Sequence, residues 1–240
     1  MIKFVDSARR QEELYSLCRG TAFGCRLSAV ALAYGFRHGF ARFWAGGGAA
    51  YCLLDGQLSI AGAPEDLTEA REFLDMLGPG SIFCERRLAD GLGLAASAEG
   101  AVMKKTVPGG EGAGFPAPGL REVCGLLQQA GMAVDFEPFY LDMSHRIRHG
   151  AALALGRYRD GELIGCAVAS AVTEEAAVLS ALAVREDCRG EGVGSRLVRE
   201  AESALPGREL CIFRESGRNR EFYERLGFAE AGRWCQQTRL

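Results

Sequence analysis

Glycine residues and one arginine stand out in residues 182–195, which read LAVREDCRGEGVGS. The apolar start predicts a strand, and the glycines at 190, 192 and 194 permit a tight turn into an amphipathic helix. In such a turn the backbone N–H groups of the first helical residues point at a bound anion. Arg189 adds a fixed positive charge beside them. The segment therefore predicts a site for a phosphorylated cofactor.

The spacing of these glycines does not match two other phosphate-binding motifs. A P-loop needs Gly-Lys-Ser/Thr after four residues, and the dinucleotide fingerprint needs Gly-x-Gly-x-x-Gly. The segment instead resembles the acetyl-CoA loop of the GCN5-related N-acetyltransferase (GNAT) family. Its pattern is Arg/Gln-x-x-Gly-x-Gly/Ala after a strand that ends in Leu-x-Val, and Arg189, Gly192 and Gly194 match it after Leu182 and Val184.

A second motif, NREFYERLGF, occupies residues 219–228. Its apolar spacing predicts a short helix, and Gly227 is a typical C-terminal cap before a final strand. It resembles the Phe-Tyr-x-x-x-Gly-Phe stretch that closes the GNAT domain. In that family the tyrosine, here Tyr223, is commonly the acid that protonates the thiolate of CoA. One departure is Ser216, because the family often has an asparagine seven residues before the tyrosine.

The resemblance implies acetyl-CoA as co-substrate and assigns roles by position. Amides of residues 189–195 hold the pyrophosphate, an N–H of Ala183 or Val184 polarises the thioester, and Asn219 contacts the cofactor arm. Tyr223 is the implied catalytic residue. The implied cofactor-binding residues are Leu182, Ala183, Val184, Arg189, Gly190, Glu191, Gly192, Val193, Gly194, Ser195 and Asn219.

Length, charge and composition narrow the classes of partner that this chain could bind. The chain has 240 residues, a net charge of -3 and no long basic run, which argues against a nucleic-acid or anionic membrane surface. No signal peptide or membrane-spanning stretch is evident, so we predict a soluble cytoplasmic protein. The nine cysteines are scattered singly, without Cys-x-x-Cys pairs, and we predict reduced thiols and no metal site.

A Gly/Pro-rich stretch at 107–119 divides the chain, since it can form neither helix nor strand. We expect an N-terminal domain at 1–106, a linker at 107–119 and a catalytic GNAT domain at 120–240. The second half predicts helices at 120–130 and 192–205 and strands at 151–159, 162–172, 176–184, 209–214 and 231–237.

The first half repeats part of this plan without the cofactor loop. It predicts strands at 41–45, 51–60 (around an Asp-Gly turn) and 81–84 and a helix at 64–77, with Gly46-Gly47-Gly48 as a hairpin loop. The expected fold class is α/β, with a mixed, mostly antiparallel sheet flanked by helices. We interpret the chain as two GNAT-like modules in tandem, the first of them degenerate.

The general base is not identifiable from sequence. Glu174 and Glu175 lie in a predicted turn, and Ser180 could only orient a water. Residues 139–150 hold two histidines and two arginines, which we interpret as a solvated loop, with recognition of a substrate carboxylate as the alternative.

The sequence thus predicts an N-acetyltransferase that acts by direct transfer to a primary amine of a small molecule or peptide, with no acyl-enzyme on Cys188. A non-catalytic acyl-CoA sensor and the use of a bulkier acyl group are the alternatives. The N-terminal half would shape the acceptor cleft or form a homodimer contact.

Overall fold

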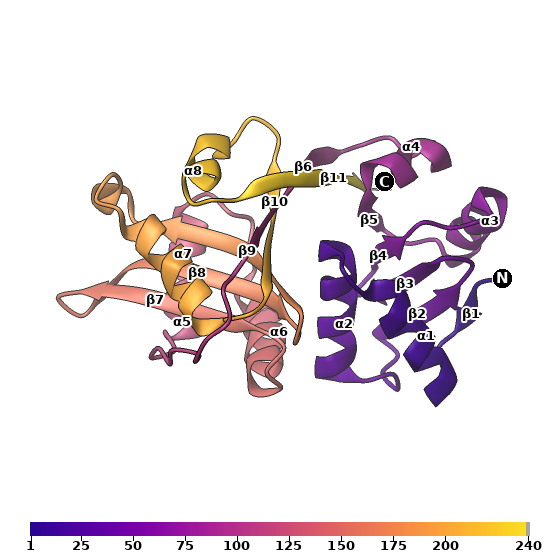
Figure 1. Cartoon of the computed structure of the whole chain (residues 1–240), viewed down its shortest axis with the longest axis horizontal. Helices are drawn as coiled ribbons and strands as arrows, with labels where there is room; N and C mark the ends of the chain where they lie inside the picture. The colour runs from indigo at the N-terminus through magenta and orange to yellow at the C-terminus, as the bar shows by residue number, and fades with distance from the viewer. Residues whose placement is uncertain (239–240) are drawn as a thin grey trace. The chain divides into compact units, whose positions relative to one another are not determined.

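The computed structural model describes residues 1–238, which form two compact units (Figure 1). Unit 1 combines residues 1–103 with the described residues from 213 onward, and unit 2 spans residues 104–212. The domain boundaries expected from the sequence, at 106 and 120, stay a prediction, while this grouping places the last described residues with the N-terminal segment. The reason is a strand pairing between distant segments, described below, which joins the last described residues to the N-terminal segment.

The expected linker, residues 107–119, has no helix or strand, as predicted. It is nevertheless held along unit 2 by its backbone. The N–H of Val107 donates to the carbonyl of Arg208, and the N–H of Ala113 donates to that of Ser203, both at 2.9 Å. Its role as a linker stays a prediction.

Unit 1 is built from a sheet with helices. Strands β2, β3 and β4 pair antiparallel in succession, β4 pairs parallel with β5, and β5 pairs antiparallel with β11. Its elements are β1 Lys3–Phe4, α1 Ala8–Cys18, α2 Ala22–Tyr34, β2 Ala41–Gly46, β3 Ala49–Leu54, β4 Gln57–Gly62, α3 Leu67–Leu77, β5 Ser81–Glu85, α4 Arg86–Leu92, α8 Arg220–Arg225 and β11 Ala229–Thr238. Strands β6 Ala98–Thr106 and β10 Glu209–Glu215 each run across the division between the units.

Unit 2 follows the same plan. Strands β7, β8 and β9 pair antiparallel in succession, and β9 pairs parallel with β10 after a helix. Its elements are α5 Leu120–Gln129, α6 Phe136–Arg148, β7 Leu153–Arg159, β8 Glu162–Val172, β9 Ala176–Val184, the 3-10 turn Glu186–Cys188 and α7 Val193–Ala204. The repeat of three antiparallel strands, a helix and a parallel strand confirms the predicted fold class and fits two related modules.

The two faces of the unit 2 sheet carry different helices. Cys166 and Val168 of β8 belong to a buried cluster with residues of α5 and α6, whereas Gly165 packs against α7. Because successive side chains of a strand alternate between faces, α5 and α6 cover one face and α7 covers the other. The chain passes from the carboxyl end of β9 through the 3-10 turn and residues 189–192 into the N-terminus of α7.

The prediction for residues 139–150 is wrong, because α6 runs from Phe136 to Arg148. Apolar residues Met143 and Ile147 pack on the unit 2 core at helical spacing. The buried Arg146 is held by Asp142 at 2.7 Å and donates to the carbonyl of Ser170 at 3.1 Å. The charged residues concealed this apolar stripe in the sequence. None of the helices within residues 1–238 combines the length and apolar content that crossing a bilayer requires.

Candidate cofactor site

The β9–α7 connection has the predicted strand, turn and helix. Gly190 and Gly192 adopt φ values of 83° and 79°, a left-handed conformation that strains any residue with a Cβ. Gly192 is the residue that precedes α7, and the N–H of Arg196 already bonds to its carbonyl at 3.0 Å. The N–H groups of Val193, Gly194 and Ser195 precede the first such bond. They have no carbonyl within the helix to pair with and are available to an anion.

The corresponding helix of unit 1 is closed to an anion. Asp66 precedes α3, and its carboxylate accepts from the N–H of Thr68 at 2.8 Å and of Glu69 at 3.1 Å. A carboxylate in this place uses the donors and the dipole that a phosphate would need. At α7 the equivalent position is glycine, which has no side chain to do so. The comparison explains why the cofactor loop is expected in unit 2 alone.

The edge of β9 opens at the point where a cofactor arm would run. Pairing with β10 covers only Ala176–Val178, while β9 continues to Val184. The register with β8 shifts opposite Leu179–Ala181, and such irregularities bend a strand. Within the described residues, β9 has thus separated from β10 along its last six residues.

Alternation along β9 identifies which backbone groups face the open edge. The N–H of Arg185 donates to the carbonyl of Ile164 on β8 at 2.9 Å. Since N–H groups of successive strand residues point to opposite sides, Ala183 also faces β8, whereas Leu182 and Val184 face away from it. Of the two donors considered for a thioester oxygen, the geometry favours the N–H of Val184.

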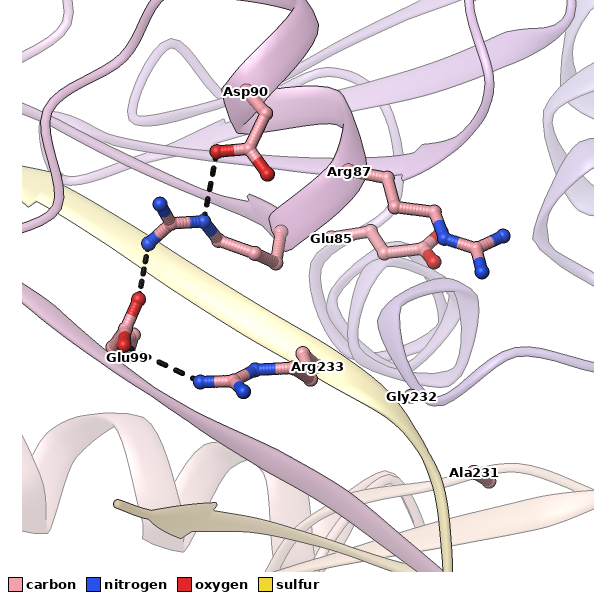
Figure 2. A pocket seen from close by; sticks show the side chains of 8 residues that line it. Glu85, Arg87, Asp90, Glu99, Ala231, Gly232 and Arg233 are labelled. Atoms are coloured by element: carbon pink, nitrogen blue, oxygen red, sulfur yellow. Dashed lines mark hydrogen bonds and ion pairs between the residues drawn. The ribbon is translucent and has the colours of Figure 1, made fainter.

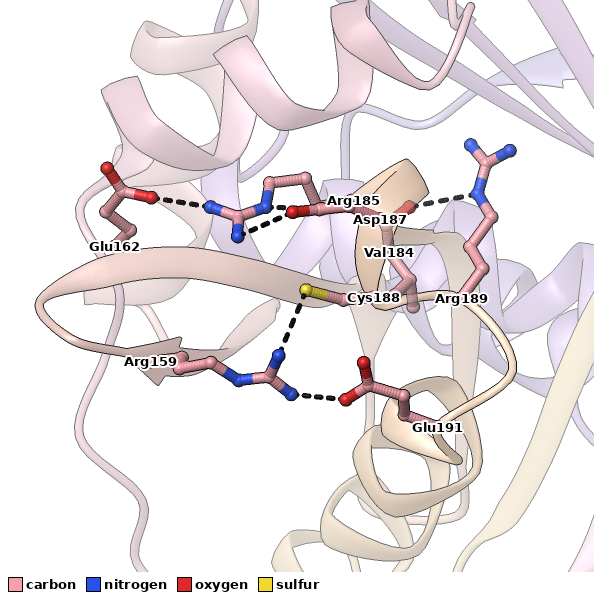
Figure 3. A network of polar contacts seen from close by, with 8 residues as sticks. All are labelled: Arg159, Glu162, Val184, Arg185, Asp187, Cys188, Arg189 and Glu191. Carbon is pink, nitrogen blue, oxygen red and sulfur yellow. Dashed lines mark hydrogen bonds and ion pairs between the residues drawn. The ribbon is translucent and has the colours of Figure 1, made fainter.

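Ion pairs hold the loop in shape, as Figure 3 shows. Arg159, at the end of β7, pairs with Glu191 and places its Nη1 3.7 Å from the sulfur of Cys188. Its hydrogen bond and charge lower the pKa of Glu191. The predicted site residue Glu191 therefore has its side chain engaged with Arg159, which leaves only its backbone N–H for a ligand.

A second ion-paired set lies on the other side of the loop. Arg185 contacts Asp187 at 2.7 Å and Glu162 at 2.5 Å, and its hydrogen bonds lower the pKa of Asp187. Arg189 donates from Nε to the carbonyl of Val184 at 3.2 Å, and Figure 3 shows its guanidinium directed away from both sets. In the described part of the chain no carboxylate is paired with Arg189, so its charge is available to an anion. The pairings of Arg159 with Glu191 and of Arg185 with Glu162 link distant residues and had no signal in the sequence.

Gly165 sets how closely α7 approaches the sheet. A Cβ at this position would lie 2.7 Å from Cγ1 of Val193 and 3.0 Å from Cδ1 of Leu197. We expect Gly165→Ala to lower the free energy of unfolding by about 1–3 kcal/mol and to weaken acetyl-CoA binding, because α7 and its first turn must shift. Urea denaturation and calorimetric titration measure the two effects.

A compensating change tests the cause. Combining Gly165→Ala with Val193→Ala removes the atom in the closest contact and should restore binding, while Gly125→Ala, in open space on α5, should leave binding unchanged. If Gly165→Ala lost stability but kept its acetyl-CoA affinity, the packing of α7 would not position the loop.

The two remaining predicted residues belong to unit 1. Tyr223, in α8, is 8% exposed and packs against Phe222 and Phe228, with ring centroids 5.0 and 5.8 Å away. Burial raises the pKa of its phenol. Asn219 precedes α8 with a left-handed φ of 54°. The pairing of these residues with the loop of unit 2 stays a prediction.

Residues considered for the base or the acceptor are found as follows. Glu174 and Glu175 lie in the β8–β9 turn, and Ser180 is exposed and donates to the carbonyl of Val168 at 3.1 Å. His145 and His149, at the end of α6, are in contact with ring centroids 4.2 Å apart and the ring planes tilted by 31°. None of these positions singles out a base.

Comparisons with known proteins agree with this geometry. Residues 121–228 match the sequence model of the acetyltransferase (GNAT) family. Curated proteins yield no match to the chain. The fold is similar to that of a solved tandem GNAT protein from the clavulanic acid biosynthesis pathway, at 16% identity with a TM-score of 0.58, covering 98% of this chain and 97% of the other.

Two further structures share the fold. A GCN5-related N-acetyltransferase from Kribbella flavida has a TM-score of 0.60 at 15% identity, with 91% of this chain and 95% of the other covered. A Drosophila protein has a TM-score of 0.62 at 14% identity, covering 99% and 98%. Residues 121–228 thus carry a domain that matches the acetyltransferase (GNAT) family, and the solved structures share its fold.

Proposed function

We propose that the protein is an acetyl-CoA-dependent N-acetyltransferase that acetylates a primary amine of a small molecule or peptide. The observation that carries the proposal is the start of α7. A glycine at φ 79° precedes a helix whose first N–H groups are available, beside an arginine that has no carboxylate partner among the described residues. Amides and a guanidinium arranged in this way suit a diphosphate. The equivalent site of unit 1 is capped by Asp66.

The open edge of β9 supplies the second part of the site. Leu182 and Val184 present backbone groups to an extended ligand, in the manner of a strand added to a sheet. The N–H of Val184 would donate to the thioester oxygen as negative charge develops there. The carbonyl of Val184 is already engaged by Arg189, which fixes the orientation of this peptide group.

Tyr223 would give its proton to the departing thiolate, and Asn219 would contact the cofactor arm. The attacking amine would lose its proton to water, since no side chain emerges as the base. Cys188 is 1% exposed, which argues against a covalent acyl-enzyme and for direct attack in a ternary complex. A cytoplasmic location stays a prediction; the nine cysteines are free and buried, which is compatible with it.

The experiment measures acetyl-CoA binding by calorimetry and release of free CoA with a panel of primary amines. Saturable binding together with amine-dependent CoA release supports the proposal. Saturable binding without turnover on any amine would favour an acyl-CoA sensor instead. Parallel titrations with propionyl- and succinyl-CoA identify the preferred acyl group.

A further inference from the structure

A cavity in unit 1 lies outside the cofactor site and is lined mainly by charged side chains. It has a volume of about 570 Å³, within the range of about 300–1,000 Å³ typical of small-molecule sites. Its lining residues are Glu85, Arg86, Arg87, Asp90, Glu99, Ala231, Gly232 and Arg233. We propose that this cavity binds a small zwitterion of the α-amino acid class, which carries one ammonium and one carboxylate.

The fold opens the cavity where two strands part. Strand β5 ends at Glu85, whose partner on β11 is Trp234, and the chain then turns into α4. Strand β11 extends beyond this last pair, back to Ala229. Residues 231–233 therefore have no β5 residue beside them and form one wall of the cavity.

The backbone of this wall offers hydrogen-bonding groups to a ligand. The N–H of Ser97 donates to the carbonyl of Gln236 at 2.8 Å, on the edge of β11 opposite to β5. Because backbone groups alternate along a strand, those of Ala231 and Arg233 point to the β5 side, where the cavity lies. The main chain can thus bond to either charged end of an amino acid.

One group of side chains around the cavity is internally paired. The carboxylate of Glu99 bridges Arg86, on one oxygen, and Arg233, at 3.3 Å on the other (Figure 2). Arg86 also contacts Asp90 at 2.9 Å. A guanidinium has five N–H donors, so Arg86 and Arg233 keep donors for a further acceptor while their planes are held in place.

Two opposite charges are left for a ligand. Among residues 1–238 the side chains of Glu85 and Arg87, which both line the cavity, have no ion pair or hydrogen bond, and Figure 2 draws no contact between either of them and Glu99. A ligand carboxylate matches the fork of a guanidinium, and a ligand ammonium matches the carboxylate of Glu85.

The formal charge of the lining excludes ligands of one sign. Three arginines balance three carboxylates, so the lining is formally neutral and a phosphate ester would add negative charge that no lining residue balances. A dication would add unbalanced positive charge in the same way. A zwitterion satisfies both signs at once, which makes the amino acid class the best chemical match.

The test titrates the full chain with each of the common amino acids by calorimetry. The tightest of them is then compared with its decarboxylated amine and its N-acetyl derivative; for leucine these are isoamylamine and N-acetylleucine. We expect saturable binding of the free amino acid at millimolar affinity or tighter, and at least about tenfold weaker binding of both analogues. If none of the amino acids binds saturably, or if the two analogues bind as tightly as the free amino acid, the proposal is wrong.

Variants locate the site. Arg87→Gln and Glu85→Gln should each weaken amino acid binding about tenfold or more, whereas Arg19→Gln, another exposed arginine of unit 1, should not. If Arg87→Gln and Glu85→Gln both bind the amino acid as tightly as the wild type, the amino acid binds elsewhere and its assignment to this cavity is wrong. Acetyl-CoA affinity is measured on the same samples and should stay constant, so failure of the acetyltransferase proposal is distinguishable from failure of this one.

Discussion

Replacing Tyr223 by phenylalanine is expected to lower kcat by about 100-fold or more, because a positioned general acid contributes about 100- to 10,000-fold to a proton-transfer step. The change removes only the hydroxyl, and the ring contacts with Phe222 and Phe228 remain. Acetyl-CoA binding and the free energy of unfolding should therefore change little. The rate of free thiol release with a saturating amine measures the effect.

One control variant accompanies this change. Tyr140→Phe removes an exposed phenol and should leave kcat unchanged. If kcat is unaltered in Tyr223→Phe, water rather than Tyr223 protonates the thiolate. If Tyr223→Phe and Tyr140→Phe lose kcat equally, the loss does not come from removal of a specific acid.

The pH profile provides an independent check on Tyr223. Burial raises the pKa of its phenol above the usual value near 10. The protonated form is the active one, so the activity that depends on it is complete below pH 10 and falls only as the pH rises through the raised pKa. A wild-type rate that declines between pH 7 and 9 and keeps this decline in Tyr223→Phe would assign the decline to another group. A decline in this range that disappears in Tyr223→Phe would contradict the raised pKa, because Tyr223 would then lose its proton below its usual pKa.

Gly192→Ala is expected to weaken acetyl-CoA binding by about tenfold or more. A Cβ in the left-handed region costs about 1–2 kcal/mol, and relief of that strain would turn the N–H groups of the first helical turn away from the anion. No described atom lies within 4 Å of the added methyl, so the effect arises from backbone conformation rather than from a clash. Calorimetric titration with acetyl-CoA measures the loss.

The choice of substitution separates conformation from other causes. Asparagine tolerates the left-handed region better than alanine, so Gly192→Asn should keep more affinity than Gly192→Ala. Gly131→Ala imposes the same strain at φ 83° on an exposed turn of unit 2 and should cost stability without affecting binding. Equal binding by Gly192→Ala and the wild type would refute the assignment of the anion to this helix.

Elements with strong local signals were predicted closely. The strand at 176–184 has the predicted bounds, and the helix predicted at 192–205 is α7, Val193–Ala204. Gly47 and Gly48 form the turn of the β2–β3 hairpin, and both they and Gly46 at the end of β2 have positive φ values, as expected of a glycine-rich loop. In each case a few neighbouring residues determine the conformation, so periodicity and turn chemistry suffice.

Features that depend on distant residues escaped prediction. The ion pair of Arg159 with Glu191 joins the end of β7 to the β9–α7 connection, and the cavity beside Glu85 needs a strand from the other end of the chain. In residues 139–150 the charged side chains hid an apolar face that only the packed core reveals. Two elements can be identified separately, but which side chains meet depends on sheet register. Local patterns within each element do not reveal the register between strands that are far apart in the sequence.

The pairing of β5 with β11 has a consequence for synthesis on the ribosome. Cys84 and its cross-strand partner Cys235 are about 150 residues apart in the sequence. The edge of β5 that pairs with β11 is therefore unpaired in the nascent chain while the whole of unit 2 is being translated. An uncovered edge invites pairing with other chains, and closing so long a loop is slow. The N-terminal segment is translated first, but its sheet is complete only when residues 229–238 have been added. A premature stop codon a few positions before residue 229 would therefore damage the fold of the N-terminal half rather than that of the C-terminal half.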